Sequence, residues 1–173
     1  DKAGDTRILE PSTAVNVLTI GSLSYSISAT SGDARVQPIA KEVGHPSPFT
    51  RVGRGVNDSI KPEICENGGN MLWHGYAQRI KRDDSLGVLS LDSNFLTKRL
   101  LATDVGTSYA APKVAHLAAT ILKNYPDASS SLIRALIASS AEVPLPTIEI
   151  FDPKDSSTQD NILRLCGYGK PDL

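Results

Sequence analysis

A short turn that opens directly into a long helical pattern is the feature that most constrains this chain. The turn is Gly106-Thr107-Ser108, and apolar residues then recur with helical spacing as far as residue 124. Ser108 therefore lies at the N-terminal end of a rigid element, where the helix dipole favours negative charge. Such a hydroxyl can cap the helix, or it can act as a nucleophile whose developing charge the helix end stabilises. Local chemistry alone favours the cap, because serine and threonine are common capping residues.

The helix that follows this turn is predicted over residues 107–124. Pro112 falls near its first turn, where a missing N–H group costs little. The sequence Tyr125-Pro126 ends the pattern, because a residue that precedes proline disfavours helical geometry. The predicted apolar face comprises Val114, Leu117, Ala118, Ile121, Leu122 and Tyr125.

Short strands and a second helix are predicted elsewhere in the chain. Strands are expected over residues 14–23, 25–29, 63–65 and 87–91, where β-branched and other apolar residues are frequent. A second helix is expected after Ser129, which is a suitable N-cap residue. Strands interleaved with helices predict a layered α/β fold.

The segments between these elements are predicted to be irregular or inserted. Residues 1–11 and 147–161 are polar and are expected to form loops. Residues 71–73 and 79–84 are expected to form the two arms of an inserted hairpin. Residues 162–166 are apolar and predict a short strand or turn before the glycine-rich end of the chain.

The turn also belongs to a longer motif. The string GTSYAAPKVA resembles the nucleophile motif of the subtilisin family of serine peptidases, which is written GTS-x-A-x-P-x-V-A. Three other segments resemble parts of that family in the same order, at residues 14–23, 47–64 and 167–172. The motif positions that match are Gly106, Thr107, Ser108, Ala110, Pro112, Val114 and Ala115.

The resemblance implies a subtilisin-like doubly wound parallel sheet with flanking helices, and it implies that Ser108 is the nucleophile. In the family an aspartate, a histidine and an oxyanion asparagine precede the first matching segment. Residues 1–173 are therefore expected to be the C-terminal portion of a subtilisin-like peptidase domain, with those three motifs upstream. The start at Asp1, without a methionine, fits an excised or processed piece. Residues 66–69 depart from the family's Ala-Pro-Gly turn, although their Asn and Gly also allow a tight turn.

No residue of this chain is expected to serve as the base for Ser108. His116 lies on the same helix, roughly 12 Å away by helix rise, which is outside hydrogen-bond reach. His45 lies in a proline-rich loop, and His74 lacks the continuation of the family's His-Gly-Thr pattern. Asp104 precedes Ser108 closely and is expected to be a turn or rim residue rather than the acid of the triad.

Composition limits which partners, cellular compartment and cofactors are expected for this chain. A formal net charge of -1 gives no basic field for nucleic acid, and no apolar run is long enough to cross a membrane. Cys65 and Cys166 lack metal-ligand spacing and are expected to be buried thiols, with a disulfide as the minor alternative. Thiols favour a cytoplasmic setting over a secreted one. No cofactor is expected; structural calcium occurs in the family, but no dense Asp/Asn loop identifies a site here.

Two functions remain open at this point. In the first, the full-length protein is a serine endopeptidase that hydrolyses a peptide or protein substrate by Ser-His-Asp chemistry, and this chain alone is inactive. In the second, the protein is a non-catalytic pseudo-protease or scaffold that binds peptides or partner proteins.

An incomplete sheet would expose apolar surface, so the isolated chain is expected to form a homodimer.

Overall fold

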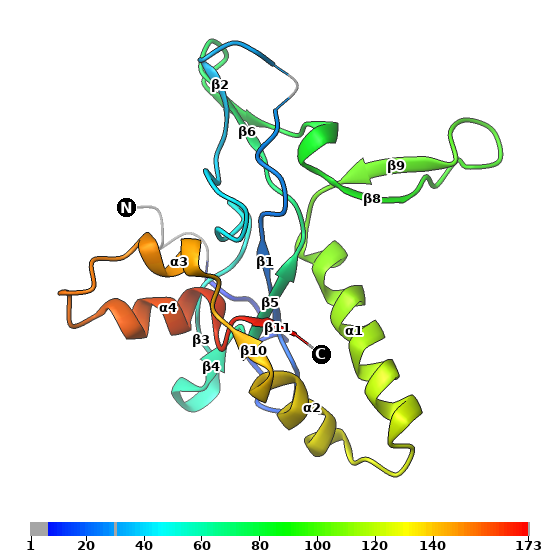
Figure 1. Ribbon diagram of the computed structural model, residues 1–173, viewed down its shortest axis with the longest axis vertical. Helices are drawn as coiled ribbons and strands as arrows, with labels where there is room; N and C mark the ends of the chain where they lie inside the picture. Colours follow the sequence, from blue (N-terminus) through cyan, green and yellow to red (C-terminus); the bar gives the residue numbers. More distant parts are fainter. Residues whose placement is uncertain (1–6, 30, 173) are drawn as a thin grey trace.

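A parallel pair of strands forms the centre of the molecule (Figure 1). The computed structural model describes residues 7–29 and 31–172 of the chain. The two central strands are β1 (Ile20–Leu23) and β5 (Ile64–Asn67), which pair in parallel along their whole length. The loop predicted at the N-terminus lies partly outside the described residues, because these begin at residue 7.

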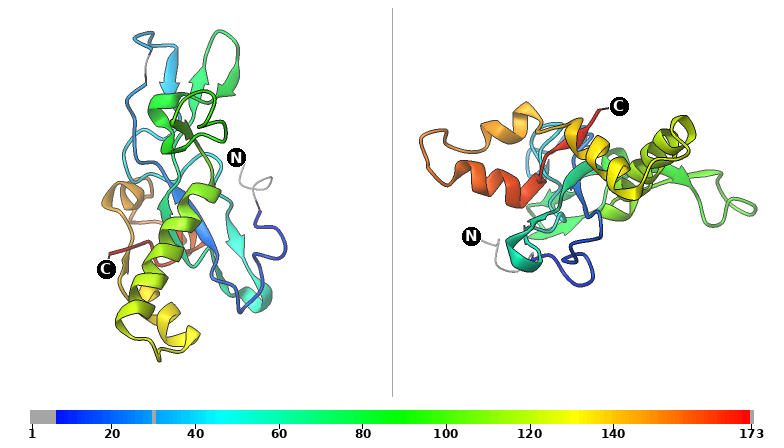
Figure 2. Two further views of the ribbon diagram at one scale, coloured as in Figure 1. Left: turned by 90° about the vertical axis from the view of Figure 1, so that its right-hand side faces the viewer. Right: turned by 90° about the horizontal axis from the view of Figure 1, so that it is seen from below.

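Helices flank this central pair. Helix α1 (Thr107–Asn124) lies on one side and α4 (Thr158–Cys166) on the other, as Figures 1 and 2 show. Helix α2 (Ser130–Ser139) packs against α1 below the strands. A parallel pair with helices on both sides confirms the predicted α/β class.

The core lies between these elements. One apolar cluster joins β5 to α1 and α2, and a smaller one lies between β1, β5 and the end of α4. Burial of these apolar side chains from water contributes favourably to the stability of the layer. The larger cluster comprises Ile64, Val114, Ile121 and Ile137, and the smaller comprises Leu23, Cys65 and Cys166.

Both predicted helices that follow the turn are confirmed. The bounds of α1 are those expected from the apolar spacing. The N-cap of α2 is Ser129, whose hydroxyl accepts a hydrogen bond from the N–H of Leu132 at 3.2 Å. These ends follow local rules of capping and proline placement, which explains why the sequence alone locates them.

Antiparallel strands project from one end of the central layer (Figure 1). Strands β2 (Val36–Pro38), β6 (Leu72–His74) and β7 (Arg79–Lys81) form one small sheet. Strands β8 (Val88–Leu91) and β9 (Leu101–Asp104) form a hairpin that leads into α1. The inserted hairpin and the strand predicted over residues 87–91 are thus confirmed.

Short elements complete the fold. They pair over only two residues each or form single helical turns. They are β3 (Gly53–Arg54) with β4 (Ile60–Lys61), β10 (Ala141–Glu142) with β11 (Lys170–Pro171), η2 (Val56–Asp58), η3 (Asp84–Leu86) and α3 (Leu145–Glu149).

Two strand predictions need correction. The strand predicted over residues 25–29 is not formed, and the one predicted over residues 14–23 is restricted to its last four residues. After β1 the N–H of Ser24 donates to the carbonyl of His45 at 2.7 Å, so the chain pairs there with a loop. Before β1, a turn forms in which the N–H of Val17 donates to Ala14. Apolar composition did not reveal these local hydrogen bonds.

The prediction for the C-terminal region is also wrong. Residues 147–161 are not a single loop and residues 162–166 are not a strand, because α3 and α4 occupy most of this region. Helix α3 begins at the prolines, where proline is tolerated in a first turn. Helix α4 is polar on its exposed face, with Asp160 and Arg164 paired one turn apart at 2.5 Å. That polar face made the segment look like a loop.

Candidate active site

Ser108 is the second residue of α1, and it is exposed. The N-cap position belongs to Gly106, and no side chain caps the first turn. The capping role that local chemistry favoured therefore does not fall on Ser108. Its hydroxyl lies at the electropositive end of α1, where the first backbone N–H groups of a helix lack intrahelical partners.

The backbone of the turn lies against the end of β5. The N–H of Gly106 donates to the carbonyl of Gly68 at 2.9 Å. A Cβ atom on Gly68 would lie 2.6 Å from the Gly106 carbonyl oxygen, and closer still to Ser22 Oγ. Lys113 of α1 donates from Nζ to the carbonyl of Asn67 at 2.9 Å. A glycine at position 68 is therefore what lets the turn approach β5 so closely.

A buried chain of hydroxyl groups lies beside this contact. Ser22 Oγ and Ser47 Oγ are 2.8 Å apart, and Ser47 Oγ donates to the carbonyl of Gly69 at 2.6 Å. Gly69 has a φ of +101°, which favours glycine, and a Cβ atom there would lie 2.8 Å from Val105 Cγ1. The tight turn expected at residues 66–69 is not formed, because Glu66 and Asn67 continue β5; glycine occupies both close contacts just after the strand.

Asp104 contacts the turn from its other side. Its Oδ1 accepts a hydrogen bond from the N–H of Val105 at 2.8 Å and lies 2.6 Å from the Arg82 guanidinium. Its Oδ2 accepts a long hydrogen bond from the Tyr109 hydroxyl at 3.4 Å. Burial and the nearby carboxylate of Asp104 raise the pKa of Tyr109, so the phenol stays protonated and able to donate. Asp104 is the last residue of β9, directly before the turn, and its partners were not apparent from the sequence.

The histidines lie on three different elements. His116 is on the exposed face of α1, and His45 lies in the loop that pairs with Ser24. His74 ends β6, and its Nδ1 accepts a hydrogen bond from the N–H of Ala77 at 3.3 Å. Within residues 7–29 and 31–172, no histidine makes a hydrogen bond to Ser108. The structure therefore does not join Ser108 to a base.

One pocket of about 270 Å³ reaches the turn at Thr107. It lies along the side of β1, and both apolar and polar groups line it. Thr107, which precedes Ser108, therefore borders a concave surface. Its other lining residues include Thr19, Ile20, Gly21, Phe49 and Pro62.

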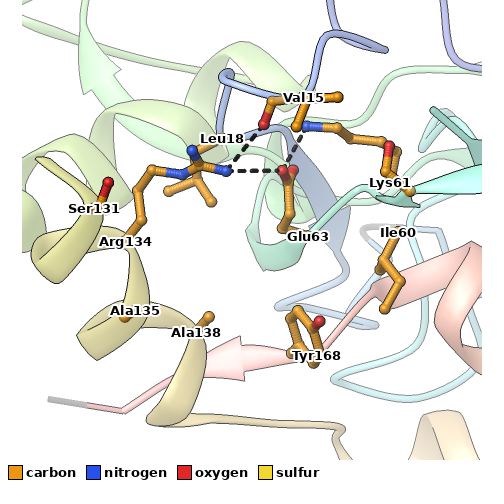
Figure 3. Close-up of a pocket in the computed structure, with 11 residues that line it drawn as sticks. Val15, Leu18, Ile60, Lys61, Glu63, Ser131, Arg134, Ala135, Ala138 and Tyr168 are labelled. Carbon is orange, nitrogen blue, oxygen red and sulfur yellow. Dashed lines mark hydrogen bonds and ion pairs between the residues drawn. The ribbon is translucent and has the colours of Figure 1, made fainter. Parts of the chain in front are cut away.

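A different pocket, of about 410 Å³, lies at the opposite end of β5 (Figure 3). Lys61 has only 1% of its side chain exposed, and its Nζ lies 2.5 Å from Glu63 Oε1. Arg134 of α2 approaches the same carboxylate at 3.6 Å and donates to the carbonyl of Val15. These ion pairs link α2 to the start of β5, so the charged side chains that line this pocket have a structural role.

The two cysteines are buried free thiols, as the main sequence interpretation predicted. They pack with Leu23 in the smaller apolar cluster. The hydrogen bond with Cys166, followed by burial, raises the pKa of the Cys65 thiol well above its ordinary value. Since the thiolate is the reactive form, Cys65 is not a nucleophile at neutral pH.

Metal and membrane sites were also considered. In the part of the chain that the structure describes, no group of three or more His, Cys, Asp or Glu side chains converges to hold a metal ion. Over the same residues, no helix combines the length and the apolar character needed to cross a membrane.

Comparisons with known proteins agree with the motif. The sequence model of the subtilase family matches residues 1–169. A protein of Sinorhizobium fredii (strain NBRC 101917 / NGR234), named "Uncharacterized protein y4bN", is 38% identical over 175 residues, covering 98% of this chain and 39% of that protein. The chain thus spans about two fifths of the length of that relative. No solved structure matches it.

Proposed function

Because the chain belongs to the subtilase family, we propose that it carries the nucleophile of a serine endopeptidase and that Ser108 is that nucleophile. The observation that carries the proposal is the position of Ser108. It is exposed at the positive end of α1, beside a backbone contact that depends on glycine. Family membership indicates serine peptidase chemistry in general, and the geometry of this turn supports Ser108 as the residue responsible.

In the proposed reaction, Ser108 Oγ attacks the carbonyl carbon of a peptide bond while a base accepts its proton. The amine leaves with that proton, and an acyl-enzyme remains. Water then attacks the acyl-enzyme, which releases the acid product and restores the hydroxyl of Ser108. The backbone N–H of Ser108 donates to the oxyanion, and such a donor is worth about 10²–10³-fold in turnover. These steps use no cofactor.

The base is proposed to come from a part of the full-length protein that precedes residue 1. This follows from the placement of the three histidines, none of which bonds to Ser108 within the described residues. In a subtilisin, which is a member of the same family, loss of the histidine costs on the order of a millionfold in turnover. The chain on its own is therefore proposed to be inactive.

The test compares the full-length protein with the isolated chain. Both are incubated with a fluorogenic peptide and with casein at equal molar concentration. The proposal expects hydrolysis by the full-length protein only. Hydrolysis by the isolated chain that disappears in Ser108→Ala would contradict the proposed origin of the base.

A pseudo-protease or scaffold is the alternative, and the missing contact between Ser108 and a base is the observation that favours it. Such a protein would bind peptides without turnover. A full-length protein that binds casein or peptides, cleaves neither, and keeps the same affinity in Ser108→Ala would support this alternative over the endopeptidase.

Assembly of the isolated chain is proposed from its exposed apolar side chains. Val15 and Val17 before β1 are exposed, as are Leu89 and Leu91 on the projecting hairpin. Exposed apolar side chains such as these favour association of chains, most simply as a two-fold homodimer. Sedimentation velocity at micromolar concentration measures it, and a monomer that does not bind a hydrophobic dye would refute it.

A cytoplasmic setting is proposed from the buried thiols. Free cysteines persist in reducing compartments, whereas secreted proteins commonly pair them. Thiol titration of the denatured full-length protein, purified under conditions that prevent thiol–disulfide exchange, tests this. Both Cys65 and Cys166 should react as free thiols; a disulfide between them would favour secretion.

A further inference from the structure

We propose that Asp104 is a positioning residue that holds Ser108 in place for attack, an inference that rests on the proposed peptidase function. Asp104 ends β9, the strand that leads into the turn. Its carboxylate contacts Val105, which precedes Gly106, and Tyr109, which follows Ser108. One side chain therefore spans the whole turn from outside.

The turn needs such external contacts because α1 begins weakly. No side chain caps its first turn. Pro112 has no N–H group, so the carbonyl of Ser108 lacks the donor that a helix normally supplies four residues ahead. The residues around Ser108 thus depend on groups from other elements for their position.

Those external contacts come from two opposite directions. On the β5 side, the Gly68 carbonyl accepts the N–H of Gly106 at 2.9 Å, which fixes the backbone before Ser108. On the other side, Asp104 reaches the Tyr109 hydroxyl at 3.4 Å, which restrains the side chain directly after Ser108. Removal of Asp104 therefore frees one side of the turn and leaves the other attached.

Arg82 keeps this carboxylate oriented. Its guanidinium lies 2.6 Å from Asp104 Oδ1, and it arrives from the segment between β7 and η3. Both side chains are substantially exposed, at 64% for Arg82 and 37% for Asp104, and exposed ion pairs add little to folding stability. A misplacement of about 1 Å, by contrast, costs about 10²-fold in rate. The effect of Asp104 should therefore appear in turnover rather than in stability.

The hairpin supplies a matched control at its other end. Asp92 follows β8, and its Oδ1 accepts the N–H of Asn94 at 2.8 Å, while Oδ2 lies 3.1 Å from Arg99 Nε. Asp92 and Asp104 therefore make the same kinds of bond on the same hairpin. Only Asp104 contacts the turn that bears Ser108. A purely structural role predicts equal effects at the two positions, and a positioning role predicts different ones.

The experiment uses the full-length protein with Asp104→Ala, Asp104→Asn, Tyr109→Phe and Asp92→Ala. Turnover and KM are measured on a short fluorogenic peptide, together with the rate at which a fluorophosphonate labels Ser108. For Asp104→Ala we expect a fall of about 10–100-fold in kcat and in labelling, with KM within about twofold. Asp104→Asn keeps an acceptor oxygen and should recover part of the loss. Tyr109→Phe should lower kcat less than Asp104→Ala, and Asp92→Ala should leave kcat unchanged.

Hydrogen exchange of residues 104–110 gives a readout that does not require turnover. Exchange should become faster in Asp104→Ala and stay the same in Asp92→Ala, with similar melting temperatures for the two variants. Equal kcat in these two variants, or a change confined to KM, would overturn the positioning role while the peptidase stands. A wild-type protein that neither cleaves nor labels would overturn the proposed function, and the inference with it.

Discussion

The central layer and the projecting strands of this molecule are stabilised in different ways. In the central layer of β1, β5, α1 and α2, Ile64 and Ile137 are fully buried. In the projecting hairpin of β8 and β9, Leu89 and Leu91 are 58% and 65% exposed. That hairpin is held by its strand ladder and by carboxylates such as Asp92, which accept backbone N–H groups and pair with arginine.

Ser108 lies where these two regions meet. On one side of its turn the N–H of Gly106 donates to the carbonyl of Gly68, just after β5, and on the other side the turn contacts Asp104. Stability should therefore depend on the central layer, whereas the fine position of the hydroxyl should depend on both regions. Substitutions in the two regions can test this difference directly.

The largest loss of stability is expected from Glu63→Gln in the central layer. Lys61 is almost fully buried and its Nζ lies 2.5 Å from Glu63, so the substitution leaves a buried cation uncompensated. Breaking a buried pair in this way costs about 3–5 kcal/mol. Denaturant unfolding of the full-length protein measures it, with Asp33→Asn in the exposed Arg35–Asp33 pair as the control. Equal losses for the two variants would contradict the contrast between the regions.

Gly68→Ala should have the next largest effect, because it changes the contact between β5 and the turn. Its Cβ atom would lie 2.6 Å from the Gly106 carbonyl oxygen, and such overpacking costs about 1–3 kcal/mol. Labelling of Ser108 by a fluorophosphonate should also slow, because the turn moves. Gly32→Ala, whose new methyl group meets nothing within 4 Å, should change neither property. Normal labelling in Gly68→Ala would show that the contact does not position Ser108.

The smallest effect is expected from Leu91→Ala on the projecting hairpin. Its side chain is exposed, so stability should change by no more than about 0.5 kcal/mol. Thermal unfolding of the full-length protein measures the change. A loss above about 2 kcal/mol, the range typical of a buried leucine, would mean that the rest of the protein covers this hairpin.

The sequence located the parts of the fold that local rules determine. Proline placement and the hydroxyl of Ser129 defined the helix that ends before Pro126 and the start of the next one. The strand predicted over residues 25–29 failed because Ser24 already bonds to a loop that is distant in sequence. Helix α4 was missed because its polar face resembles a loop, and its contacts are with strands far away in the chain, which no local pattern reveals.

The candidate site, too, has parts that the sequence predicted and parts that it did not. Ser108 could be proposed from the motif and from its place at a helix start. The groups that hold it could not, since Gly68 reaches the turn, and Arg82 reaches Asp104, from segments that only the fold brings together. Asn and Gly predicted a tight turn at residues 66–69; instead β5 continues through Asn67, and the contact of Gly68 with Gly106 was not predicted. The motif thus identified the hydroxyl, and tertiary structure defined what holds it.

The most direct test of the central claim is the activity of the full-length protein with Ser108→Ala. The substitution removes one exposed oxygen, so the fold and the melting temperature should stay the same. Casein hydrolysis should fall on the order of a millionfold, as loss of the serine does in a subtilisin, and fluorophosphonate labelling should disappear. A variant that cleaves casein at the wild-type rate would contradict the assignment of Ser108 as the nucleophile.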